Sequence, residues 1–198
     1  DEGYKLLEKG MAQYPHLNYF YHSAAYTKFT ISEFTKAWEI VQTWLKYFPT
    51  NSDAHYYKAK ILLEISPKTY REEIIDAAKQ SIKFNPKNPY AFEVLACALW
   101  ICNKDYAGLV ENFKQAIRLQ PENSSLHNSF GFYLLQSGKK DQALEEHMIA
   151  VRLNPVEKSY IENIYFTKAH QNFFVKWAYL LPNSKIGGKL VSLVSFLL

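Results

Sequence analysis

The chain has 198 residues, 48% of them hydrophobic and 16% aromatic, with seven glycines and eight prolines, which excludes a disordered or collagen-like protein. The length allows a sizeable buried core. Lys and Arg number 23 against 19 Asp and Glu, giving a formal net charge of +4 that excludes neither acidic nor basic partners by itself. Two cysteines, Cys97 and Cys102, provide no disulfide framework, and we interpret them as reduced packing residues.

The N-terminal residues lack both an initiator methionine and the apolar run of a cleavable secretory signal. This start predicts a mature product or an excised fragment of a longer protein.

Prolines recur along the chain at an almost constant interval. They stand 34, 37, 35 and 34 residues apart, at Pro15, Pro49, Pro86, Pro121 and Pro155. Each follows an amphipathic run and precedes polar residues such as Asn or Ser, which is typical of a turn and the start of the next helix. A fixed period of about 34 residues indicates an array of helix–turn–helix repeats.

Each period contains two helical stretches. "YAFEVLACALWIC" and "YAGLVENFKQAIRLQ" fill the third period, and "SSLHNSFGFYLLQS" and "QALEEHMIAVRLN" fill the fourth. Small residues recur on the first stretch of each period, where they allow a close helix–helix approach: Ala25, Ala59, Cys97 and Gly131.

This pattern resembles the tetratricopeptide repeat over about residues 18–155. The fourth unit carries it most fully, with Gly131, Leu134, Ala143, Ala150 and Pro155. The resemblance implies an all-α fold, a right-handed α-solenoid of stacked helix–turn–helix repeats with a C-terminal helical tail. Several residues depart from the pattern and change the helix spacing: Trp44, Ile74, Ser81, Leu109 and His147, together with the longer inter-helix segment "SPKT" of the second unit.

The domain organisation follows from the period. Residues 1–17 would form the second helix of a partial or capping repeat, and 158–182 would form capping or amphipathic helices before an apolar tail at 183–198. Between them we expect four repeats, at 18–51, 52–89, 90–123 and 124–157.

Catalytic and cofactor motifs are missing from the sequence. It contains no glycine-rich phosphate loop, no G-x-S-x-G elbow, no H-E-x-x-H and no histidine pair at i,i+4 spacing. His147 is interpreted as a packed histidine, and carboxylate pairs such as Glu72–Glu73 as parts of solvated helix faces. We therefore expect no enzyme activity, no cofactor and no metal.

A binding surface is the remaining functional feature. First helices line the concave side of such a solenoid, the usual binding face. By the resemblance, this side would present Tyr19, His22, Tyr26, Phe29, Tyr56, Lys60, Leu63, Val94, Ile101, Asn128, Phe132 and Leu135. The lysine–asparagine–arginine clamp that some tetratricopeptide proteins use for a terminal carboxylate is absent. An apolar, tyrosine-rich groove fits an apolar peptide or a partner helix instead.

The C-terminal region carries the whole excess of positive charge. No acidic residue follows Glu162, whereas Lys168, Lys176, Lys185 and Lys189 do. Residues 190–198 are uncharged but too few to cross a bilayer. The lysines and the aromatic residues of this region are typical of a membrane interface. They predict a membrane contact on the cytoplasmic side, made by Phe173, Phe174, Lys176, Trp177, Tyr179, Lys185 and Lys189. The alternative is a tail that folds onto the repeats and covers the groove.

Three functions fit these observations. The first is a non-enzymatic interaction scaffold with a protein or peptide partner, tethered near a membrane. The second is a tetratricopeptide regulatory module cut from a larger enzyme. The third is an RNA-binding helical-repeat protein, against which the neutral charge of residues 1–162 argues, so that no nucleic acid is expected as a partner.

Overall fold

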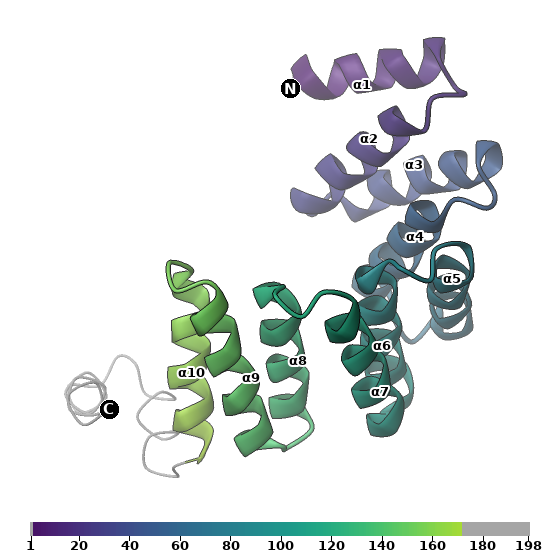
Figure 1. Ribbon diagram of the computed structural model, residues 1–198. Coiled ribbons are helices and arrows are strands. Elements are labelled where there is room, and N and C mark those ends of the chain that lie inside the picture. The colour runs from purple at the N-terminus through teal and green to yellow at the C-terminus, as the bar shows by residue number, and fades with distance from the viewer. Residues whose placement is uncertain (1, 172–198) are drawn as a thin grey trace. The chain divides into compact units, whose positions relative to one another are not determined.

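The computed structural model describes residues 2–171, and every regular element among them is an α-helix (Figure 1). This confirms the predicted all-α fold of paired helices. The helices are α1 Glu2–Gln13, α2 Asn18–Thr30, α3 Phe34–Tyr47, α4 Ser52–Ile65, α5 Arg71–Phe84, α6 Pro89–Asn103, α7 Tyr106–Leu119, α8 Ser124–Gln136, α9 Lys140–Leu153 and α10 Lys158–Gln171.

All five periodic prolines lie in turns between successive helix pairs, as predicted. After three of these turns, an asparagine side chain caps the next helix. Asn51 Oδ1 accepts a hydrogen bond from the amide of Ala54 at 2.9 Å, and Asn88 and Asn123 cap α6 and α8 in the same way. An N-cap of this kind satisfies an amide that the helix leaves unpaired and contributes about 1 kcal/mol.

The chain divides into two compact units, Asp1–Gln120 and Pro121–Leu198. In the first unit each helix contacts the next, and the first helices of successive pairs also touch, α2 with α4 and α4 with α6. Helix α1 packs on α2, where Lys28 Nζ lies 3.7 Å from the ring centroid of Tyr4 and 3.2 Å from Glu33 Oε2. These contacts give the first unit a layer of first helices, made of α2, α4 and α6.

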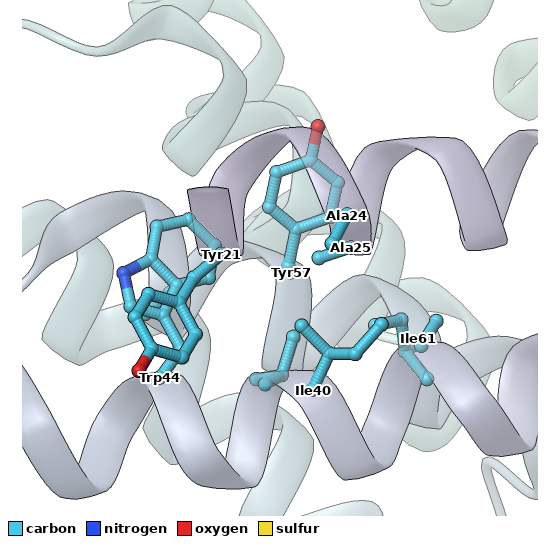
Figure 2. Close-up of a cluster of buried hydrophobic side chains, with 10 residues drawn as sticks. Tyr21, Ala24, Ala25, Ile40, Trp44, Tyr57 and Ile61 are labelled. Atoms are coloured by element: carbon cyan, nitrogen blue, oxygen red, sulfur yellow. The ribbon is translucent and has the colours of Figure 1, made fainter. Parts of the chain in front are cut away.

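Trp44, one of the departures from the repeat pattern, belongs to one of the two core clusters of the first unit. Its side chain is fully buried among residues of α2, α3 and α4, including Tyr21 and Ile40 (Figure 2). The indole Nε1 donates a hydrogen bond to Asn18 Oδ1, so the one polar atom of the ring is satisfied. The same core cluster contains two small residues of α2, Ala24 and Ala25.

Ser81, another departure from the repeat pattern, is also fully buried, and it joins neighbouring helix pairs. Its Oγ donates to the backbone oxygen of Ser52 at 2.9 Å, and the Ser52 hydroxyl donates to the backbone oxygen of Ser81 at 3.0 Å. This reciprocal pair satisfies the hydroxyls that burial would otherwise leave without partners.

The second unit contains α8, α9 and α10, of which α9 contacts both others. His147 on α9 is 1% exposed and packs against Gly131 on α8, which confirms its interpretation as a packed histidine. A Cβ placed on Gly131 would meet His147 Cε1 at 2.8 Å. The small residue predicted at this position is therefore required by the close approach of the two helices.

Part of the predicted C-terminal region is seen as α10, which begins at Lys158. The rest of the segment 158–182, the apolar tail 183–198 and all seven residues assigned to a membrane contact lie outside the described residues. Between residues 2 and 171, no helix combines the length and apolar character needed to span a bilayer.

Candidate functional site

A tyrosine-lined groove opens on the first-helix layer of the first unit, with a volume of about 350 Å³. Helices α2 and α4 form its sides, and the beginning of α6 closes one edge. Five of the residues predicted to bind a partner line it together: His22, Tyr26, Phe29, Tyr56 and Lys60. Residues more than thirty positions apart in the sequence therefore meet in one cavity because α2 stacks directly on α4.

The remaining predicted residues lie elsewhere. Tyr19 is 70% exposed on α2 but does not line the groove. Leu63 packs against the second core cluster of the first unit, and Ile101 is half-buried near the end of α6. Asn128, Phe132 and Leu135 belong to the second unit, where Asn128 Oδ1 accepts a hydrogen bond from Asn163 at 2.8 Å.

Val94 differs most from its predicted role. It is only 4% exposed and belongs to a core cluster with Leu62 and Ile74, so it is not available to a partner in this structure. Helix α6 contacts α4, α5 and α7, and its middle turns are covered on several sides as a result.

Five groove residues were missed by the sequence analysis: Thr30, Asp53, Tyr57, Asn88 and Tyr90. For Asp53 a signal was present, because it lies three positions before Tyr56 and seven before Lys60, which places all three on one face of a helix. Asn88 and Tyr90 carried no such signal. They belong to the turn and first residues of the next repeat, and only the stacking of α4 on α6 brings them to the groove.

The floor of the groove is a set of aromatic rings in contact. Tyr57 is central: its ring centroid lies 5.6 Å from that of His22, 6.5 Å from Phe29 and 5.1 Å from Tyr56. Its ring is also part of the core shown in Figure 2, with its hydroxyl directed away from Ile40 and Ile61. Burial raises the pKa of Tyr56 and of Tyr57 far above the ordinary tyrosine value, so both phenols remain neutral.

Two charged side chains, Lys60 and Asp53, also line the groove. Lys60 Nζ donates a hydrogen bond to the Tyr56 hydroxyl at 2.9 Å and lies 4.9 Å from the ring centroid of Phe29, a cation–π distance. Asp53 lies in the first turn of α4. Neither side chain forms an ion pair with any residue in the described part of the chain.

The side chains that line the groove supply groups that can recognise a ligand. Its aromatic faces bind apolar groups and cations, and the phenols, Lys60 and Asp53 supply directional polar contacts. Over residues 2–171, no three His, Cys, Asp or Glu side chains come together in a way that would hold a metal ion.

Comparison with known proteins identifies the architecture. No protein-family model matches the sequence, and a search of characterised proteins finds no relative. Solved structures do match. The TPR protein TTC0263 of Thermus thermophilus superposes with a TM-score of 0.74 at 15% identity, over 83% of this chain and 88% of that one.

This chain has the tetratricopeptide-repeat fold. PilF of Pseudomonas aeruginosa matches with a TM-score of 0.64 at 19% identity, over 78% of this chain and 68% of its own. YrrB, described as a TPR protein with an unusual peptide-binding site, matches with a TM-score of 0.55 at 16% identity, over 83% of each chain. At these identities, the likeness establishes the tetratricopeptide-repeat fold and nothing further about this chain.

Proposed function

We propose that this tetratricopeptide-fold protein is a non-enzymatic interaction scaffold whose groove on α2, α4 and α6 binds a peptide or helical segment of a partner protein. The observation that carries the proposal is the convergence of Tyr26, Tyr56 and Lys60, with other aromatics, on one open cavity of the first-helix layer. Solenoid repeats bind partners on such a layer, and exposed aromatic clusters supply much of the affinity at interfaces. The peptide-binding site of YrrB, a protein with the same fold, supports the proposal.

A display library of random twelve-residue peptides tests the groove, with the full chain as the immobilised target. We expect the wild-type chain to enrich peptides and Tyr26→Ala to weaken binding of the selected peptides by about tenfold, as for the loss of a well-packed aromatic anchor. Tyr26 is 54% exposed, so its replacement should leave the helical content unchanged.

Tyr14→Ala is the matched control, because Tyr14 is 48% exposed and does not line the groove. Fluorescence anisotropy of a labelled selected peptide measures both variants. Equal affinity of the wild-type and Tyr26→Ala chains would place the binding site elsewhere on the molecule.

We also infer that the region after Glu162 associates with an anionic membrane surface. The support is the sequence itself, since four lysines and several aromatic residues follow that position without any acidic residue. Each lysine near an anionic surface contributes about 1 kcal/mol. Sedimentation with phosphatidylserine-containing vesicles should therefore bring down the whole chain and lose most of it when residues 172–198 are deleted. Equal sedimentation of both forms would refute the membrane contact.

A further inference from the structure

The groove carries opposite charges along a single helix face. Asp53, Tyr56, Tyr57 and Lys60 all belong to α4, and all four side chains line the cavity. Seven positions separate the acid from the base, which corresponds to about 10 Å along the helix axis. The aromatic rings of Tyr56 and Tyr57 lie between them. The cavity therefore carries one negative and one positive charge, with aromatic rings and uncharged polar groups forming the rest of its lining.

Asp53 lies in the first turn of α4, where a carboxylate interacts favourably with the helix dipole, but it is not the cap of the helix. Asn51 is the N-cap of α4, and its side chain, not that of Asp53, accepts the hydrogen bond from the Ala54 amide. Among the described residues, no basic side chain pairs with the Asp53 carboxylate. Tyr26 and Tyr90, which are 54% and 40% exposed, line the same cavity as Asp53.

Lys60 shows that the cavity also accommodates a cation. Its ammonium lies 4.9 Å from the Phe29 ring centroid and 5.3 Å from that of Tyr56. One of its three N–H donors is used by the Tyr56 hydroxyl. The side chain contacts no carboxylate in the described part of the molecule, so the remaining donors are available to an acceptor that enters the groove.

We propose that the groove recognises a dipolar segment of a partner protein, in which an apolar side chain is flanked by a basic residue that pairs with Asp53 and an acidic residue that pairs with Lys60. This deepens the proposed function and rests on it. Charge complementarity carries the assignment: an apolar segment alone would leave both charges partly desolvated and unpaired, which disfavours its binding. The basic residue gains additional attraction from the surrounding tyrosine rings.

The same peptide library, displayed against the full chain, tests this preference. Peptides enriched by the wild-type chain should contain a basic and an acidic residue on either side of an apolar one. For a labelled selected peptide, Asp53→Asn should weaken binding about fivefold or more, as should replacement of the peptide's basic residue by glutamine. Because both changes break the same ion pair, combining them should cost little more than either alone.

Lys60→Met should likewise weaken binding, and combining it with replacement of the peptide's acidic residue should cost little more than either change alone. Asp76→Asn and Lys79→Met on α5 are the matched controls, since both side chains are exposed and neither lines the groove. Circular dichroism of each variant verifies that the helices remain intact.

The outcomes separate the two proposals. If no peptide is enriched, or if Tyr26→Ala binds as well as the wild type, the groove itself is not a binding site and the proposed function fails. If peptides bind through Tyr26 but show no charged flanks, or if the Asp53→Asn and peptide substitutions are additive, the dipolar preference is wrong while the peptide-binding function stands.

Discussion

Replacing Gly131 with leucine is expected to lower the free energy of unfolding of the second unit by about 1–3 kcal/mol or more. A Cβ at this position would lie 2.8 Å from both Cε1 and Nδ1 of His147 and 3.1 Å from the backbone oxygen of Ala143. The imidazole is buried and cannot move away without disturbing the contact between α8 and α9. Thermal unfolding followed by circular dichroism, with hydrogen exchange of the α8 and α9 amides to locate the change, measures the effect.

A double-mutant cycle identifies the cause. Gly131→Ala alone should also destabilise the unit, whereas in a His147→Ala background the same methyl group should cost less, because the imidazole is gone and only the 3.1 Å approach to the Ala143 backbone oxygen remains. If Gly131→Leu unfolds at the temperature of the wild type, the close packing of α8 on α9 at this residue is refuted.

The repeat architecture was predictable because it depends on local chemistry that recurs at one interval. Prolines end each pair of helices, and asparagines such as Asn51 and Asn123 begin the next, so the turns could be placed from the sequence. Small residues such as Gly131 could be assigned to helix contacts for the same reason, since only a close approach requires them.

The groove was predictable only in part, because it combines residues of one repeat with the start of the next. Positions on α2 and α4 follow the repeat pattern, and Tyr26 and Tyr56 were found in this way. Tyr90 lies in the first turn of α6 and reaches the groove only through tertiary stacking. Val94 was assigned to the binding face because it occupies the corresponding position of the third repeat. In the structure it is buried in a core cluster by the neighbouring helices.

The division into two units was not predictable from the period. Pro121 recurs in register with the other prolines, and the turn that it forms is capped by Asn123 like the others. The turn chemistry therefore gives no sign of the boundary after Gln120. A repeat pattern determines where helices begin and end, and it carries no information on how many compact units those helices form.

Acid should destabilise the second unit through His147. Burial lowers the pKa of this imidazole from 6.5 to about 4, and its Nδ1 has no hydrogen-bond partner among the described residues. In the unfolded chain the same histidine takes up a proton near pH 6.5, so the unfolded state binds more protons between these two values. The free energy of unfolding is therefore unaffected by His147 protonation above about pH 6.5. It decreases as the pH falls from 6.5 towards 4, by about 3 kcal/mol in total.

His127 acts in the opposite direction and must be separated from this effect. Its Nδ1 lies 2.7 Å from Glu146 Oε2, and this hydrogen bond raises the pKa of His127 above 6.5. The stability that it contributes is complete below the unfolded pKa and is lost as the pH rises through the folded value. The second unit should consequently lose stability on both sides of a maximum near or just above pH 6.5.

Replacing His147 with leucine should remove the acidic side of this profile and leave the alkaline side in place. Hydrogen exchange of the α8 and α9 amides, compared with the wild type at each pH so that intrinsic exchange rates cancel, measures the difference between pH 6.5 and 4. His16→Leu is the control, because His16 is exposed and belongs to the first unit. The leucine alters packing equally at every pH. The decisive quantity is therefore the slope of the stability against pH, compared between the variant and the wild type. An unchanged slope in His147→Leu would mean that another group carries the acid sensitivity.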